Sequence, residues 1–230
     1  NSPHLSQLRH LALDECEIGE DALVAMAESP FLRPRTLTFY ENPFGSRGGA
    51  ALLGSSVMER IAHLEIGEIP IGDSSVIALC NNVNAQRLHR LELGTCNLGN
   101  DSLVALSKAS WPRLRLLSLC DEKFTDESGV ILASSPLIGS LQSLSLSVSQ
   151  ISDATVLALA SSPHVRNLRS LNLGHNQITN EGARALAESP NLSRLHKLIT
   201  WGNPITRKGH ERLWERFGDN AYPQKQQLDR

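Results

Sequence analysis

The feature that most constrains the fold of this chain is a repeat of 26 or 27 residues that occurs eight times. Each copy carries an apolar anchor residue at the same position of the repeat. The anchors are Leu11, Leu37, Leu64, Leu91, Leu117, Leu144, Leu171 and Leu198. A unit this short cannot bury its apolar face alone, so successive units must stack on one another. The repeat therefore predicts an open solenoid and not a closed globule.

Each unit begins with a strand. The clearest copy, residues 168–178, has the pattern LxxLxLxxNxI. Leu171 and Leu173 in this copy alternate with polar residues, and a period of two indicates a short strand with one buried face. The outward residues of such strands would form columns across a parallel sheet.

A helix follows each strand. In the same unit Ala183, Leu186 and Ala187 are spaced as one face of a helix. Thr179 and the polar residues after it are typical of a helix start, and Pro190 ends the helix. We therefore expect one strand, one tight turn, one helix and a return loop in every unit.

The pattern resembles the ribonuclease-inhibitor-like class of leucine-rich repeats. That class has a glycine or a hydroxyl residue directly after the third apolar position of the repeat. Here those residues are Gly19, Gly45, Gly72, Gly99, Thr125, Ser152, Thr179 and Thr206. The resemblance covers residues 5–217 and implies a right-handed α/β solenoid, a horseshoe with a parallel β-sheet on its concave side and helices on its convex side. The amino-acid sequence of the units also resembles that of bacterial tandem-repeat proteins.

One domain, residues 1–217, accounts for the eight units. Residues 195–217 are predicted to act as the C-terminal cap, with Trp214 and Phe217 covering the last apolar layer. Residues 218–230 abandon the period and are predicted to form a polar tail. The chain opens within a return loop, so we expect the natural protein to continue before residue 1.

The four cysteines do not form a metal or disulfide pattern. Cys16 and Cys96 occupy the asparagine position of the repeat, Cys80 occupies a small helix position, and Cys120 lies on the outward side of a strand. Neighbouring strands are about 5 Å apart, so residues three units apart cannot meet. We therefore predict four free thiols, which suit a reducing, cytoplasmic compartment.

Charge and hydropathy exclude several kinds of partner. The net charge is −2 and the isoelectric point is about 6.5. This gives no overall basic footprint for nucleic acid or for an anionic membrane. No stretch approaches the roughly 18 apolar residues of a membrane span. We expect a monomer that binds neither nucleic acid nor membrane.

No catalytic, cofactor-binding or metal-binding residue is predicted. The loop from Gly45 to Gly49 resembles a phosphate-binding loop, but no GK[ST] follows, and Gly45 aligns with the turn glycine of other units. The eight histidines form no HExxH motif, and no acidic partner is placed beside a nucleophile, so no catalytic triad can be built. The chain is therefore predicted not to be an enzyme and to need no cofactor.

The candidate contacts lie in the outward columns of the predicted sheet. Tyr40 and Trp201 stand near opposite ends of one column, with small residues between them, and exposed aromatic side chains are typical binding anchors. Glu65 and Glu92 are adjacent like charges, which cost stability unless they are paired. Arg90, together with His63 on the neighbouring strand, is placed to offset them. Four acidic residues of the following loops extend this acidity along one rim: Glu41, Glu68, Asp121 and Glu122.

The asparagine position of the repeat is not filled in every unit. In this kind of fold the buried amide satisfies backbone groups of the turns in adjacent units. Ser149 is able to form such bonds, whereas Ile69 and Glu122 are predicted not to replace the asparagine. We expect local distortion in those two units.

The sequence predicts a non-catalytic scaffold that binds a protein or peptide partner on the concave face. The predicted partner-binding residues are Tyr40, Glu65, Arg90, Glu92 and Trp201. Two alternatives remain open. The chain is either a targeting or regulatory arm of a larger protein whose N-terminal region carries the activity, or a GTPase-activator-like regulator, for which no loop arginine can be assigned.

Overall fold

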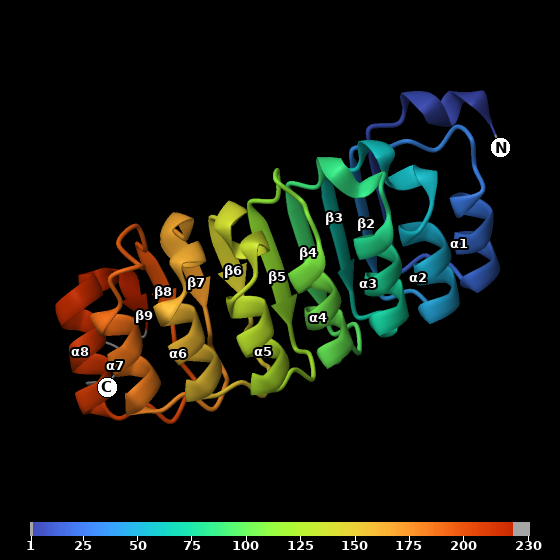
Figure 1. Cartoon of the computed structure of the whole chain (residues 1–230). Helices are drawn as coiled ribbons and strands as arrows, with labels where there is room; N and C mark the ends of the chain where they lie inside the picture. Colours follow the sequence, from blue (N-terminus) through green and yellow to red (C-terminus); the bar gives the residue numbers. More distant parts are fainter. Residues whose placement is uncertain (1, 223–230) are drawn as a thin grey trace.

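The computed structural model describes residues 2–222, which form one parallel sheet flanked by helices (Figure 1). Nine strands follow one another across the sheet in sequence order. They are β1 (His10–Asp14), β2 (Thr36–Tyr40), β3 (His63–Gly67), β4 (Arg90–Gly94), β5 (Leu116–Cys120), β6 (Ser143–Ser145), β7 (Ser170–Asn172), β8 (Lys197–Ile199) and β9 (Ala221–Tyr222). This is the α/β solenoid that the repeat predicts.

Eight α-helices cover one face of the sheet and leave the other face free (Figure 1). They are α1 (Glu20–Ala27), α2 (Ser46–Leu53), α3 (Gly72–Asn81), α4 (Asn100–Lys108), α5 (Asp126–Ala133), α6 (Asp153–Ser161), α7 (Asn180–Glu188) and α8 (Arg207–Phe217). Packed helices lie about 8–10 Å apart and strands about 4.8 Å apart, so the free sheet face is the concave face.

Short 3-10 helices occupy most return segments, along the edge where the strands begin (Figure 1). They are η1 (Pro3–Gln7), η2 (Ser56–Arg60), η3 (Ala85–Arg87), η4 (Pro136–Ser140) and η5 (Pro163–Asn167), and η6 (Gly218–Asn220) follows α8. Serines begin several of them. For example, the Ser135 hydroxyl accepts a hydrogen bond from the Leu137 amide at 3.1 Å.

The anchor leucines pair across the sheet as the repeat predicts. Leu37 pairs with Leu64, and Leu64 pairs with Leu91. The anchors of β2 to β8 are fully buried. The core is therefore a continuous ribbon between the sheet and the helices, and the inward helix residues Leu186 and Ala183 complete it.

The C-terminal end differs from the expected tail that begins at residue 218. Phe217 is buried and Trp214 packs against the core, as a cap requires. The chain then turns through η6, and Ala221 pairs with Leu198 to start β9. Ala221 is buried because it covers the open edge of the sheet beside β8. The rest of the predicted tail, residues 223–230, lies outside the described residues.

An asparagine ladder joins adjacent units at the turns after the strands. The Asn42 side-chain oxygen accepts hydrogen bonds from the amides of Cys16 and Ile18 at 3.1 and 3.0 Å. Its amide nitrogen donates to the carbonyl oxygens of Leu13 and Tyr40. A single buried side chain thus satisfies backbone groups of two units, which would otherwise be costly orphans.

The prediction that Glu122 cannot replace the asparagine is wrong. Its two carboxylate oxygens accept hydrogen bonds from the amides of Cys96 and Leu98, each at 2.7 Å. Burial raises the pKa of Glu122 to about 7, although these two amide bonds oppose the shift. The prediction that Ser149 can form the backbone hydrogen bonds of the asparagine is also wrong, because its hydroxyl is buried without a hydrogen-bond partner among the described residues.

Candidate binding face

The structure places the five predicted contact residues on the concave face, in the columns that the repeat predicts. Glu65 of β3 lies opposite Glu92 of β4, and His63 lies opposite Arg90. Tyr40 ends β2, and Trp201 follows β8. Their side chains form two separate clusters, because β5, β6 and β7 lie between β4 and β8.

Tyr40 lies flat across Gly67 of the next strand. A Cβ atom at Gly67 would lie 2.5 Å from Cε2 of the Tyr40 ring, so only glycine permits this position. The Tyr40 hydroxyl donates a hydrogen bond to the Glu68 carboxylate. This bond is the main reason that the pKa of Tyr40 is raised to about 12, and desolvation and the charges of Glu68 and Glu41 act in the same direction.

A shallow hollow of about 170 Å³ lies beside the tyrosine ring on the concave face. Tyr40, Glu65 and Glu92 line it, and Gly67 and Gly94 leave room at its base. The structure therefore brings three of the five predicted contacts together around one depression that is both aromatic and acidic.

Arg90 forms an ion pair with Glu92 on its own strand. Hydrogen bonding to Glu92 is the main cause of the raised pKa of Arg90. Within residues 2–222 the Glu65 carboxylate receives no hydrogen bond and forms no ion pair, and His63 forms no ion pair with it. The hollow therefore keeps one uncompensated carboxylate, which faces solvent.

Trp201 stands over Gly174 of the preceding unit. A Cβ atom at Gly174 would lie 3.0 Å from Cδ1 and Nε1 of the indole ring. The ring also contacts His175, with ring centroids 4.9 Å apart, and 56 % of Trp201 is exposed. The tryptophan therefore extends over the preceding unit, whereas Phe217 covers the end of the core.

The surface between the two aromatic side chains is small and hydroxyl-rich. Cys120 is the centre of a network in which its sulfur lies 3.2 Å from the Ser118 hydroxyl and 3.3 Å from the Ser145 hydroxyl. The Ser147 hydroxyl donates to the same sulfur at 3.2 Å. These side chains bond to one another, so the middle of the concave face is low in profile.

The acidic rim is shorter than predicted. Glu41, Glu68 and Asp121 are exposed at the ends of their strands, with φ angles of 46°, 54° and 58°. Glu122 is 4 % exposed and points into the ladder, so it does not belong to the rim. The reason is that its carboxylate replaces an asparagine inside the turn.

The described residues contain neither a metal-binding cluster nor a membrane-spanning helix. No group of three or more His, Cys, Asp or Glu side chains within residues 2–222 is arranged to hold a metal ion. No helix in the same range has the length and apolar character that crossing a membrane requires. Cys80 and Cys96 are free thiols whose pKa values burial raises to about 12.

Another set of candidate residues lies outside the outward strand columns. Arginines recur one and three positions before the strands, at the opposite edge of the sheet from the acidic rim. The signal was present in the sequence as pairs such as Arg33 with Arg35 and Arg113 with Arg115. The net charge does not reveal these arginines, because it adds the charges of both edges of the sheet.

Comparisons with known proteins agree with the repeat. A family model described as Leucine Rich repeat matches residues 164–187. The fold is similar to that of a plant ice-binding protein, with a TM-score of 0.51, 19 % identity and coverage of 86 % of this chain and 57 % of that one. Comparison with curated protein sequences found no match.

Two further structures are similar at lower scores. One is the yeast complex of Rad7 and Elc1, with a TM-score of 0.48, 18 % identity and coverage of 88 % and 65 %. The other is the ectodomain of the Arabidopsis thaliana receptor kinase GASSHO1/SCHENGEN3 in complex with CASPARIAN STRIP INTEGRITY FACTOR 2. Its TM-score is 0.45 and its identity 16 %, and the match covers 96 % of this chain and 27 % of that one. This chain spans 57 % and 65 % of the lengths of the ice-binding and Rad7–Elc1 chains. The matched repeat at residues 164–187, the buried anchor leucines and the parallel sheet in sequence order show that this chain has the fold of a leucine-rich repeat solenoid.

Proposed function

We propose that this chain is a non-catalytic scaffold that binds a protein or peptide partner on its concave face. The observation that carries the proposal is the position of two exposed aromatic rings on the free sheet face, each lying over a glycine of a neighbouring unit. The proposed contacts are Tyr40, Glu65, Arg90, Glu92 and Trp201. We further propose that the protein acts as a cytoplasmic monomer, which fits its four free thiols.

Rigidity is the physical advantage of this surface. The sheet is fixed by the buried core, so binding orders little backbone and loses little conformational entropy. The ring of Tyr40 is held by Gly67 and by the hydrogen bond to Glu68, and the ring of Trp201 contacts His175. Aromatic anchors that are already positioned contribute most of their contact area to affinity.

The charges around the hollow define the chemistry of the proposed partner. Glu65 is exposed without an ion-pair partner among the described residues, and Glu41 and Asp121 are exposed nearby on the rim. A partner segment that places a Lys or Arg at the hollow and an apolar side chain against Tyr40 would match this surface. The low middle of the face leaves room for the same segment to reach Trp201.

The test compares the Tyr40→Ala/Trp201→Ala variant with the wild type in quantitative capture from a lysate of the source organism. The matched control is Val83→Ala/Ile131→Ala, which removes two exposed apolar side chains outside the concave face. Each captured protein is then titrated against all three forms. We expect the aromatic variant to bind at least about tenfold more weakly, whereas the control binds normally. Equal affinities for all three forms would contradict the proposal.

A further inference from the structure

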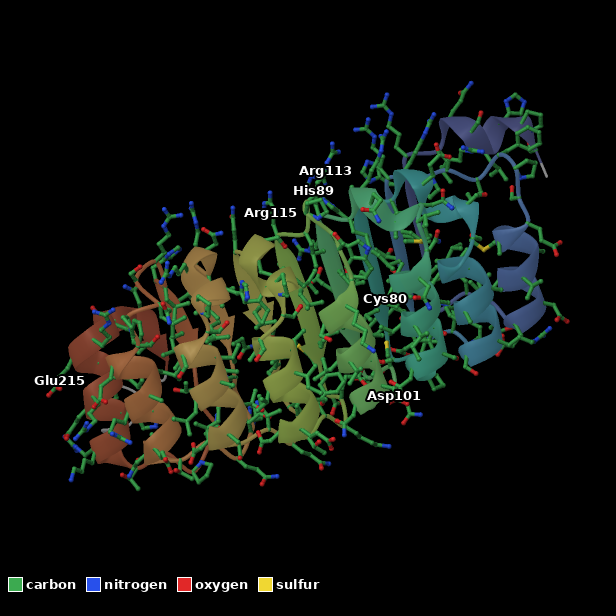
Figure 2. All side chains as sticks on the ribbon, in the orientation of Figure 1. Cys80, His89, Asp101, Arg113, Arg115 and Glu215 are labelled. Carbon is green, nitrogen blue, oxygen red and sulfur yellow. The ribbon has the colours of Figure 1, made fainter. Side chains whose placement is uncertain are left out.

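Two columns of basic side chains run along the edge at which the strands begin. We call this edge, with η2 to η5 beside it, the basic edge. One column lies one position before each strand and contains Arg9, Arg35, His89, Arg115, Arg169 and His196. The other lies three positions before each strand and contains Arg33, Arg60, Arg87, Arg113 and Arg194. Figure 2 shows side chains that end in nitrogen gathered along this edge, including Arg113, His89 and Arg115.

The arginines of the basic edge are almost all without a carboxylate partner. Within residues 2–222 Arg33 alone among them forms an ion pair, with Glu59. Arginines on the helices behave differently, since Arg47 pairs with Asp21 and Arg184 also has a carboxylate partner. The basic edge therefore presents exposed guanidinium groups whose charge the protein itself does not neutralise.

A recess interrupts the two columns in the sixth unit. There Ser140 and Gln142 occupy the two column positions in place of longer basic side chains. Two adjoining hollows of about 470 and 500 Å³ open at this point, and Gly139 lines both. Arg115 lines one of the hollows, and Arg194 lines both. Arg169, from the unit after the recess, also contributes. The recess is thus polar, open to solvent and flanked by positive charge from the units on either side.

Hydrogen bonds hold part of this arrangement in place. Nη1 of Arg115 donates to the carbonyl oxygens of Pro112, Leu114 and Ser140 at 2.9, 3.0 and 3.2 Å. Nη1 of Arg194 donates to Asn167 Oδ1 at 3.3 Å. Each guanidinium group has five N–H donors, so further donors remain for a ligand.

The two edges of the sheet act as separate electrostatic surfaces. Asp101 marks the opposite edge in Figure 2, near the ends of the strands that carry Glu41, Glu68 and Asp121. A five-residue strand spans about 17 Å, which exceeds the Debye length of about 8 Å at physiological salt. The acidic rim therefore does not cancel the field at the basic edge. The net charge of −2, from which we expected no nucleic-acid binding, averages over both edges and does not describe this one.

We propose that the basic edge binds the phosphate backbone of a nucleic-acid duplex without sequence preference. Guanidinium groups bind phosphate oxygens through paired, charge-assisted hydrogen bonds, and phosphate contacts alone supply most non-specific affinity for nucleic acid. The recess admits one ridge of a duplex backbone between the flanking arginines. The proposal does not depend on the concave face, which lies on a different surface.

Other polyanions match this edge less well. The two columns and the lining of the recess carry no exposed aromatic or large aliphatic side chain among the described residues. A protein interface needs an apolar centre, and single-stranded nucleic acid is held mainly by stacking on aromatic rings. A flat lipid surface cannot enter the recess.

The test measures fluorescence anisotropy of a labelled DNA duplex of about 30 base pairs over a range of salt concentrations. The variant is Arg87→Gln/Arg113→Gln/Arg169→Gln, whose three side chains form no hydrogen bond or ion pair within residues 2–222. We expect micromolar binding by the wild type near 50 mM salt, and binding at least about tenfold weaker by the variant. The slope of log K against log salt should decrease by about 2 to 3.

Two controls separate a specific edge from total charge and from misfolding. Arg47→Gln/Arg184→Gln/Arg212→Gln removes the same charge from the helices and should bind within about threefold of the wild type. Arg87→Lys/Arg113→Lys/Arg169→Lys keeps the charge and should retain both the affinity and the salt slope. Thermal melting by circular dichroism should be the same for all four proteins.

Three outcomes would overturn the proposal. One is no duplex binding at low salt, and another is an equal loss in the helix control. The third is binding to vesicles that contain phosphatidylserine without any binding to the duplex, which would assign the edge to a membrane instead.

Discussion

The Asp126 carboxylate accepts hydrogen bonds from both the amide and the hydroxyl of Thr155, at 3.1 and 2.6 Å. It also accepts a bond from the Ser152 amide at 2.8 Å, so a residue of α5 caps the N-terminus of α6. The first amides of a helix have no partner inside the helix, and here the preceding unit supplies one. The same relationship recurs at Glu20, Asp73 and Asp153. Helix capping and the stacking of units are therefore one interaction.

Replacing Asp126 by alanine should lower the free energy of unfolding by about 2 kcal/mol, because a half-buried cap is lost and the amides of α6 remain without a partner. Chemical denaturation measures the change. Asp101→Ala is the matched control, since Asp101 is exposed near the start of α4 and forms no hydrogen bond within residues 2–222. It should change stability by less than about 0.5 kcal/mol. Equal effects would show that the cap between units is not important.

The cap should also make the protein sensitive to acid. Burial alone would raise the pKa of Asp126, but the hydrogen bonds from Ser152 and Thr155 outweigh it, and the net shift is downward. Its stabilising contribution is therefore present above the unfolded-state pKa and is lost as the pH falls through the lower folded value. In acid the stabilities of the wild type and Asp126→Ala should converge. A constant difference down to the lowest pH at which the protein stays folded would contradict this.

Glu122 should give a pH dependence of the opposite sign. Its pKa is raised to about 7 by burial, so the folded state holds the proton more firmly than the unfolded state does. The contribution to stability is full below the unfolded-state pKa, and roughly 3 kcal/mol is lost as the pH rises through about 7. Glu122→Gln should flatten the pH dependence of the unfolding free energy between about pH 5 and 8. Glu127→Gln, at an exposed position of α5, should leave it unchanged.

The Tyr40–Glu68 hydrogen bond should be visible in a spectroscopic titration. The chain has two tyrosines, so a Tyr222→Phe background isolates Tyr40. Ultraviolet absorbance of the phenolate should then report a pKa of about 12. Glu68→Gln should lower this pKa towards the ordinary tyrosine value, because both the hydrogen bond and the negative charge oppose ionisation. Glu41→Gln should have a smaller effect, and an equal effect of the two variants would exclude the hydrogen bond as the main cause.

The four thiols should differ widely in reactivity. Cys16 is exposed, whereas burial raises the pKa values of Cys80 and Cys96 to about 12 and so suppresses their thiolate forms. With a disulfide reagent at mildly alkaline pH, Cys16 should react rapidly, and Cys80 and Cys96 should react only after denaturation. Cys16→Ser should abolish the rapid phase. Rapid modification of Cys96 in the folded protein would contradict the buried ladder.

The repeat alone predicted the solenoid, the strand register and the side of each strand that faces the core. The physical reason is that parallel pairing aligns equivalent positions of successive units, so Leu64 must lie beside Leu37 and Leu91 once the units stack. The same rule placed Tyr40, Glu65, Arg90, Glu92 and Trp201 on one face. Phe217 is buried, and the role of residues 195–217 as a C-terminal cap stays a prediction.

Only the tertiary structure decided what individual side chains do within that frame. The Glu122 side chain points inward, where its carboxylate accepts hydrogen bonds from two amides of the neighbouring unit. The Tyr40 ring lies across Gly67, because glycine has no side chain at that position. The separation of charge onto two edges is likewise invisible in a net charge of −2, since a sum over the sequence carries no positions. A repeat fixes where each residue stands, and contacts between units fix which neighbour its side chain meets.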